Sequence, residues 1–304
     1  MEQAAHIEGL NKRFGVAGVA EIVAGSGGLP TVRITSKLAE AEISLYGAQV
    51  LRWRPAGAEE VLFLSRQSRW EQGTAIRGGI PVCFPWFRAK TDDSHAPKHG
   101  FVRTREWRLD SLGTSEDGMV TLLCVTGSDD ETRRWWPHEF LCAYRIGVGP
   151  ELRLELSVVN RGNSVMRFEE ALHTYFQVGE AGLARVHGLD GATYLDNMDA
   201  NQARRQVGDL SIQQQIDNAY METTDTVEVM DPVLRRRLRT EKMNSASTVV
   251  WNPWHEGAAG MTDMEPESWR RMLCVEASNV LGCAVTLRPD EEHTLHAALS
   301  VQPE

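Results

Sequence analysis

The sequence lacks the motifs that identify several large enzyme classes. It contains no Gly-x-Ser-x-Gly, no phosphate-binding P-loop and no Gly-x-Gly-x-x-Gly dinucleotide fingerprint. The last two motifs depend on glycine because their backbones must approach a phosphate closely. Chemistry on nucleoside triphosphates or nicotinamide is therefore not expected, and we predict no cofactor.

Cysteine is scarce, and it does not form the patterns of a metal site. The five cysteines are odd in number and contain no Cys-x-x-Cys pair: Cys83, Cys124, Cys142, Cys274 and Cys283. Four of them lie within apolar runs, so buried free thiols and a reducing compartment are expected. His293 and His296 are three residues apart, which on a strand places them on opposite faces instead of on one zinc ion. We predict no metal.

Positive charge is also in deficit. The 32 Lys and Arg residues are outnumbered by 42 Asp and Glu, which gives a formal net charge of −10. Nucleic acid and anionic membranes would repel such a chain at long range, so neither is an expected partner. A local cluster of arginines remains compatible with binding a small anion.

Long apolar runs are absent too. No stretch approaches the length of a membrane span, and residues 1–15 lack the apolar segment of a secretory signal. The composition, with 42% apolar and 24% charged residues, is ordinary for a soluble globular protein. We therefore expect a soluble, cytoplasmic protein that acts as a monomer.

The chain does contain many short segments in which apolar and polar residues alternate. The clearest is Leu152 to Val158, and similar runs, divided by Gly, Pro, Asn and Asp, extend from about residue 30 to 301. A period of two is typical of strands with one buried face. The pattern predicts an all-β protein, a large sandwich of antiparallel sheets.

The composition shows no break that would divide the chain. We expect one β-sandwich domain over residues 1–304, in which residues 1–29 form an N-terminal extension with a short helix over Glu8–Phe14. Gln202–Ile216 is the best remaining candidate for a helical or irregular segment, and it is polar.

One stretch, Arg77 to Phe87, concentrates an arginine, two glycines, two prolines and three aromatic residues. Such a composition disfavours a helix or a central strand. One interpretation is a tight loop leading into an edge strand whose aromatic residues belong to the core. The other is a ligand site, in which Gly78 and Gly79 let the backbone approach a ligand next to Arg77.

Two histidines and two acids stand out among the titratable residues. His99 is flanked by cations, which would lower its pKa and favour the neutral imidazole. His173 lies in an aromatic strand and is either a core residue or a catalyst. Glu276 lies in an apolar strand, where it is either on a solvated face or a desolvated base with a raised pKa. Asp217 is a turn residue or a ligand contact.

The remaining histidines and the tryptophans carry weaker signals. Trp86, Trp251 and Trp254 fall in loops, and a flat indole suits the C–H face of a pyranose, although packing explains most tryptophans. Six histidines have no special neighbours and are expected to be structural or exposed: His6, His95, His138, His187, His293 and His296.

Four motifs, taken in order, resemble one family. They are Arg77-Gly-Gly-Ile-Pro81 with Phe84-Pro85, His99-Gly100 with Arg103, Ala171-Leu-His-Thr-Tyr-Phe176, and Trp251-Asn-Pro-Trp254 leading to Gly260-Met261-x-Asp263 and Cys274-Val-Glu276. Each is weak alone. Together they resemble the glucose-6-phosphate 1-epimerases, the hexose-6-phosphate branch of the aldose 1-epimerase (galactose mutarotase-like) superfamily, from about Leu45 to Leu287.

The resemblance implies a fold, a reaction and roles for particular residues. The fold would be a large β-sandwich with the sugar in a cleft of one sheet, and the reaction the interconversion of α and β anomers of a hexose 6-phosphate. By position His173 matches the general acid, expected as imidazolium, and Glu276 the general base. Asp217 matches a carboxylate that holds sugar hydroxyls. Arg77 and Arg103 match the arginines at the phosphate, with Lys98, His99 and Trp86 as further substrate contacts.

Two departures from the family pattern concern substrate choice. Lys98 stands where a neutral glutamine is expected, and Asn218 follows Asp217 where relatives often carry arginine. Two alternatives remain open: an aldose 1-epimerase acting on unphosphorylated sugars, and a non-catalytic carbohydrate-binding sandwich. The arginine pair disfavours the first, since a neutral sugar needs no such pair, and the acid–base pair disfavours the second.

Overall fold

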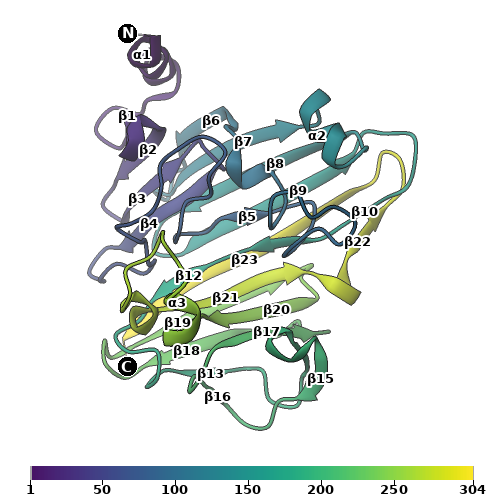
Figure 1. Ribbon diagram of the computed structural model, residues 1–304. Helices are drawn as coiled ribbons and strands as arrows, with labels where there is room; N and C mark the ends of the chain where they lie inside the picture. The colour runs from purple at the N-terminus through teal and green to yellow at the C-terminus, as the bar shows by residue number, and fades with distance from the viewer. Residues whose placement is uncertain (1, 304) are drawn as a thin grey trace.

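A computed structural model describes residues 2–303 and confirms the predicted all-β class (Figure 1). The helices are short: α1 (Glu2–Phe14), α2 (Asp130–Trp135) and α3 (Trp254–Ala258). Helix α1 covers the predicted helix over Glu8–Phe14 and begins earlier, at Glu2. No helix within residues 2–303 is long and apolar enough to cross a membrane.

The larger of the two main sheets has nine antiparallel strands. Its order is β16-β13-β18-β19-β23-β9-β8-β7-β6. The bounds, in chain order, are β6 (Arg108–Thr114), β7 (Val120–Gly127), β8 (Phe140–Val148), β9 (Leu152–Asn160), β13 (Arg185–His187), β16 (Leu210–Ser211), β18 (Val227–Asp231), β19 (Arg236–Met243) and β23 (Glu292–Pro303). Strand β9 covers the clearest alternating run of the sequence, and its Leu152, Leu154, Leu156 and Val158 are fully buried.

The second main sheet has eight strands and carries most of the motifs singled out in the sequence. Its order is β15-β14-β17-β20-β21-β11-β5, and β12 also pairs with β21. The bounds are β5 (Val82–Cys83), β11 (Glu170–Leu172), β12 (Tyr175–Gln177), β14 (Thr193–Asp196), β15 (Gln202–Arg205), β17 (Ile216–Met221), β20 (Ser247–Asn252) and β21 (Met272–Asn279). The segment Gln202–Ile216 contains no helix. Apart from β15, β16 and the first residue of β17 it is irregular, which agrees with the irregular alternative.

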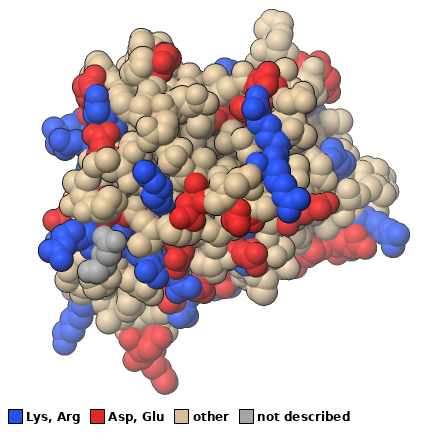
Figure 2. Space-filling view, turned by 90° about the horizontal axis from the view of Figure 1, so that it is seen from below, with Lys and Arg blue, Asp and Glu red and all other residues tan. Residues whose placement is uncertain are grey.

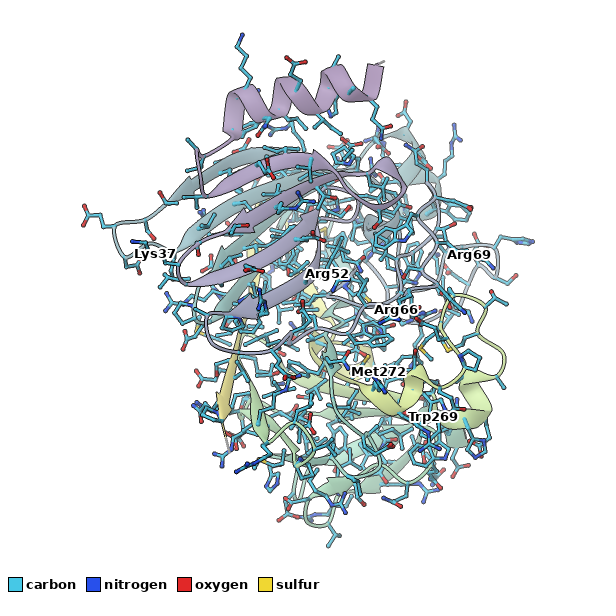
Figure 3. All side chains as sticks on the ribbon, turned by 90° about the vertical axis from the view of Figure 1, so that its left-hand side faces the viewer. Lys37, Arg52, Arg66, Arg69, Trp269 and Met272 are labelled. Carbon is cyan, nitrogen blue, oxygen red and sulfur yellow. The ribbon has the colours of Figure 1, made fainter. Side chains whose placement is uncertain are left out.

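Two smaller sheets complete the architecture. One has the order β1-β2-β3-β4, with bounds Ala20–Ala24, Pro30–Thr35, Ala39–Ser44 and Gln49–Pro55, and the other pairs β10 (Met166–Phe168) with β22 (Val285–Leu287). Figure 3 shows α1 lying along the outer side of the four-stranded sheet. Its Ile7, Leu10 and Phe14 pack against the core, which explains why an otherwise polar segment forms a helix here.

The core lies between the main sheets because one face of each is apolar. Leu122, Tyr144 and Leu154 of the nine-stranded sheet share one contiguous cluster with Leu172 and Val275 of the eight-stranded sheet. Aligned packing of two apolar faces is the usual way to bury a pair of antiparallel sheets. The other face of the eight-stranded sheet is therefore free to hold different side chains.

On the surface, basic and acidic side chains are interspersed, as the face in Figure 2 shows. The arginine-rich strand β19 illustrates this, because Arg237 and Arg239 both pair with Glu228, at 3.7 and 2.8 Å. Its third arginine, Arg236, is buried and donates to the backbone oxygens of Glu60 and Gln177.

A buried ion pair links the two main sheets. His293 of β23, predicted to be unremarkable, lies with its Nε2 3.0 Å from Oε1 of the fully buried Glu170 of β11. The same oxygen accepts a 2.9 Å hydrogen bond from Asn279. Burial lowers the pKa of His293, but the hydrogen bond and charge of Glu170 outweigh burial and raise it.

We predict that this pair makes stability depend on pH. Because the folded-state pKa of His293 is raised, its stabilisation is complete below the unfolded value of about 6.5 and is lost as pH rises through the folded value. His293→Ala should cost about 3 kcal/mol at low pH, since it leaves a buried carboxylate unpaired. Urea denaturation across the pH range, compared with the non-titrating control His293→Gln, measures the effect. A pH-independent difference between wild type and both variants would contradict it.

Candidate active site

The candidate site lies on the face of the eight-stranded sheet that points away from the core. Asp217 of β17 is paired with Trp251 of β20, and Trp251 with Cys274 of β21. Residues directly opposite in an antiparallel sheet project to the same side. Glu276, two residues after Cys274, shares that side because strand side chains alternate. The register thus aligns Asp217 and Glu276 on one face.

His173 reaches the same face from the break between β11 and β12. The backbone N–H of His173 donates to the carbonyl of Pro81 at 3.0 Å. The carbonyl of the next residue, Thr174, accepts from the backbone N–H of Val275 at 3.2 Å. The imidazole Nδ1 then lies 3.4 Å from Oε1 of Glu276. His173 is 6% exposed and Glu276 is fully buried. Within residues 2–303, neither this Nδ1 nor either Glu276 oxygen has a hydrogen-bond partner.

The electrostatics of this pair differ from the expected imidazolium and carboxylate. Burial raises the pKa of Glu276, and the charge of Asp217 raises it further, against Arg88 and Arg103. Burial lowers the pKa of His173, and the charges of Arg103 and Arg77 lower it further. Both shifts disfavour the charged pair and favour the uncharged form, with protonated Glu276 and neutral imidazole. Desolvation of two charges outweighs their attraction here. The raised pKa of Glu276 agrees with the desolvated alternative.

Aromatic side chains fix the imidazole of His173. The ring of Tyr175 stacks on it at a centroid distance of 4.7 Å and an interplanar angle of 10°. Trp251 meets both rings edge-on, at 6.1 Å from His173 and 5.9 Å from Tyr175. Tyr175 was not predicted as a site residue, although it lies within the motif that contains His173.

Arg77 joins this group through Tyr175. Its Nη1 donates to the Tyr175 hydroxyl at 2.9 Å, while Nε and Nη2 both donate to Oδ2 of Asp263, at 3.1 and 2.9 Å. Burial opposes the charge of Arg77, but Tyr175 and Asp263 outweigh burial and raise its pKa. The sequence motif included Asp263, but nothing in it indicated that Asp263 would hold Arg77.

The segment that carries Asp263, residues 259–268, is tied down by the chain before Arg77. Ser65 Oγ and the N–H of Arg66 donate to Glu265 at 3.0 and 3.1 Å. Arg69 Nη2 donates to the hydroxyl of Thr262 at 2.7 Å. Figure 3 shows Arg66 and Arg69 next to this loop. The Arg77–Asp263 pair is therefore held from both sides.

Arg103 and His99 come from the segment around the 3-10 turn at Val102–Thr104. Arg103 Nη2 donates to the carbonyl of Lys98 at 2.8 Å, and its Nε has no partner among the described residues. Lys98 itself is exposed. Burial lowers the pKa of His99, and Arg103 lowers it further, so the predicted neutral imidazole is confirmed with burial as the larger cause.

Asp217 is held by a residue that the sequence did not point to. Arg88 Nη2 donates to Asp217 Oδ1 at 2.6 Å, and Asn197 Nδ2 donates to Oδ2 at 2.7 Å. Asp217 is a strand residue and not part of a turn. Asn218, where an arginine was expected, is buried and alternates to the other side of β17. The cation beside Asp217 thus comes from a different part of the chain.

Trp86 does not join the group. It is 7% exposed, belongs to the core cluster, and its indole N–H donates to the carbonyl of Pro97 at 2.8 Å. Its ring meets Phe101 edge-on at 5.5 Å. Trp86 thus follows the packing alternative, while Trp251 contacts the candidate acid. The prediction that Trp251 and Trp254 lie in loops was wrong, because Trp251 belongs to β20 and Trp254 begins α3.

The two glycines after Arg77 make room for the protein's own backbone. A Cβ on Gly78 would lie 2.4 Å from the carbonyl oxygen of Phe63, and a Cβ on Gly79 2.2 Å from that of Val50. Both have positive φ, +115° and +62°. On the ligand-site interpretation this clearance would serve a ligand. In the structure it lets residues 78–79 run against Phe63 and Val50, as the tight-loop interpretation expects.

No group of three or more His, Cys, Asp or Glu residues within residues 2–303 could hold a metal ion. The five cysteines are free, and four of them are buried, as expected.

The chain matches the aldose 1-epimerase family over residues 30–300. It belongs to the aldose 1-epimerase family. Like other members it is an isomerase, a mutarotase that interconverts the anomers of a sugar.

Two relatives and one solved structure show which proteins of known sequence or structure this chain is similar to. The chain is 33% identical over 274 residues to a protein of Cenchrus ciliaris named "Putative glucose-6-phosphate 1-epimerase", covering 86% of this chain and 82% of the relative. An Escherichia coli K12 protein of the same name is 33% identical over 268 residues, with 86% of each chain covered. The crystal structure of a "putative mutarotase" from Salmonella typhimurium superposes with a TM-score of 0.89 at 27% identity, covering 96% of both chains.

The close backbone approach at Gly79 yields a prediction about how the site is held. Gly79→Ala should destabilise the protein by about 3 kcal/mol, from the left-handed conformation and the overlap with Val50. The matched control is Gly57→Ala, because Gly57 has φ +79° but no atom within 4 Å of the added Cβ. That control should lose only about 1 kcal/mol. Equal loss in both variants, measured by urea denaturation, would show that the overlap does not matter.

Proposed function

We propose that this mutarotase acts on a hexose 6-phosphate, most simply glucose 6-phosphate, with Glu276 and His173 as the acid–base pair. The observation that carries the proposal is the 3.4 Å contact of a buried carboxylate and imidazole beside three arginines, Arg77, Arg88 and Arg103. Two proton-transfer groups are what mutarotation needs, and the cations suit an anionic substrate.

The reaction is a proton exchange around the ring oxygen. Glu276 as base takes the proton from the anomeric hydroxyl, and His173 as acid gives a proton to the ring oxygen while the C1–O5 bond opens. The aldehyde then rotates about C1–C2, and the 5-hydroxyl adds to its other face. In the closing step His173 takes back the proton from that hydroxyl, and Glu276 returns its proton to the carbonyl oxygen. The catalyst is regenerated with no net proton uptake.

The charge state of the pair links the chemistry to the phosphate. In the free protein the arginines help to keep His173 neutral. A phosphate dianion bound next to Arg77 and Arg103 would offset their positive field, and so shift the shared proton from Glu276 to His173. The substrate's own phosphate would thereby favour the form in which carboxylate and imidazolium are ready for ring opening. A neutral sugar would lack this effect.

The roles of the other residues follow from their positions. Arg77 presents a guanidinium already oriented by Asp263, and the Nε of Arg103 has no hydrogen-bond partner within residues 2–303, so both suit a phosphate. Asp217 would accept from sugar hydroxyls, and His99 and the exposed Lys98 would line the phosphate side. We further propose that the chain acts as a single-domain monomer in the cytoplasm.

Two other functions are less well supported. An epimerase for unphosphorylated sugars would not need the cations around His173. A carbohydrate-binding sandwich without activity would not need a buried carboxylate beside an imidazole, since such a contact is costly to bury. NMR exchange between anomers, comparing glucose with glucose 6-phosphate, separates the three.

We predict that Glu276→Gln removes catalysis while leaving binding nearly intact. The amide has the size of the carboxyl group but cannot accept the anomeric proton, so kcat should fall at least about 100-fold. Anomer exchange by NMR gives the rate, and calorimetry with glucose 6-phosphate gives the affinity. The exposed Glu292 supplies the control Glu292→Gln, which should behave as wild type. Normal turnover of Glu276→Gln would remove Glu276 as the base.

We predict that Arg77→Ala discriminates between phosphorylated and neutral sugars. Loss of charge-assisted hydrogen bonds should weaken binding of glucose 6-phosphate about 10- to 100-fold, with a much smaller change for glucose. Isothermal calorimetry with both sugars measures the difference, and Arg145→Ala, an exposed arginine on β8, is the control. Equal loss for both sugars would favour an enzyme for unphosphorylated aldoses.

A further inference from the structure

We propose that Arg88 is a positioning residue for catalysis, which neutralises Asp217 so that the buried Glu276 can act as base. The inference rests on the proposed role of Glu276. Arg88 belongs to none of the motifs that led to the site, and its part in the reaction follows from its contacts alone.

The backbone of Arg88 is held in an unusual conformation. Its φ is +61°, in the left-handed region that residues with a Cβ rarely occupy. Two hydrogen bonds to His99, itself at φ +63°, hold it there. The backbone N–H of His99 donates to the carbonyl of Arg88 at 2.7 Å, and the backbone N–H of Arg88 donates to His99 Nδ1 at 3.3 Å. Strain of this kind persists where surrounding contacts impose it. Here it aims the side chain across the sheet at β17.

The guanidinium of Arg88 forms its ion pair with the carboxylate of Asp217. Nη2 lies 2.6 Å from Asp217 Oδ1 and 3.4 Å from the Asp217 carbonyl, and Nη1 donates to Asn201 at 2.9 Å. Both charged side chains are well covered, with 16% of Arg88 and 17% of Asp217 exposed. Because Asn197 holds the second oxygen, the orientation of Asp217 is fixed at both ends.

The Arg88–Asp217 pair matters because both of its charges act on Glu276. The groups that act on it come from every neighbouring element: His173 from the β11–β12 break, Asp217 from β17, Arg103 from the 3-10 turn, Arg88, Cys83 from β5, and Cys274 on its own strand. Burial raises the pKa of both thiols, so they stay neutral. The charges that remain are one anion, Asp217, against two cations.

Removal of Arg88 would leave Arg103 as the one cation of this set that favours the charged form of Glu276. With both Glu276 oxygens lacking a hydrogen-bond donor among residues 2–303, its proton affinity follows the local field. An uncompensated Asp217 would make the His173–Glu276 pair hold its protons more tightly. The bell-shaped dependence of kcat on pH would then move to higher pH as a whole, because both proton steps of the pair respond to the same charge.

The test is a cycle of three variants measured by the pH dependence of kcat. We expect Arg88→Gln to move the bell upward by about one pH unit or more, as the loss of a nearby unit charge does. Asp217→Asn should move it downward, and Arg88→Gln with Asp217→Asn should return it close to the wild-type position, although KM is raised in each. Titration of the substrate phosphate is common to all four proteins and cancels from the comparison.

The possible results separate a positioning role of Arg88 from a purely structural role. They also show whether the proposed function itself is wrong. A role in folding alone would lower kcat equally at all pH values, and this would overturn the inference. An upward shift that persists in the double variant would also overturn it, because Asp217 would not be its cause. If Arg88→Gln does not fold, the downward shift of Asp217→Asn decides. Activity retained by Glu276→Gln would instead sink the base assignment, whereas an inactive Glu276→Gln with an unmoved bell sinks only the role of Arg88.

Discussion

The constraint on which this structure depends is that strand β21 is buried on both faces. Val275 and Ala277 pack into the core between the main sheets, whereas Cys274 and Glu276 point to the opposite side. Covering a carboxylate this completely raises its pKa and leaves its charge state to its neighbours. A shift of register by one residue would put Glu276 into the apolar core, so the pairing of β21 with β20, β11 and β12 decides both fold and chemistry.

The three arginines near the His173–Glu276 pair differ in whether they have an acidic partner. Two arginines are already paired, Arg77 with Asp263 and Arg88 with Asp217, and Arg103 has no acidic partner within residues 2–303. The paired arginines have fixed directions, because each guanidinium has neighbours that hold it. This local excess of positive charge exists within a chain of net charge −10.

Aromatic packing connects these arginines to His173 and Glu276, the proposed acid–base pair. Tyr175 touches Arg77 with its hydroxyl and His173 with its ring face, so any displacement of the guanidinium reaches the imidazole through one side chain. Gly78 and Gly79 let the chain just after Arg77 run against Phe63 and Val50. A site that must hold an acid and a base in close contact gains from supports of this kind, since small displacements lower proton-transfer rates.

The sequence by itself determined the β class, the core-facing residues of β9 and the free thiols, since these depend on alternation and composition along the chain. It also pointed to His173 and Glu276, through motifs shared with a family. Tertiary structure alone decided that Arg88 meets Asp217, that Asp263 holds Arg77, that His293 pairs with Glu170 and that Trp86 turns into the core. Burial in the folded chain also works against the expected imidazolium and carboxylate, because it raises the pKa of Glu276 and lowers that of His173. Each of these follows from strand register and burial, which bring together residues far apart in the chain, and local pattern carries no record of either.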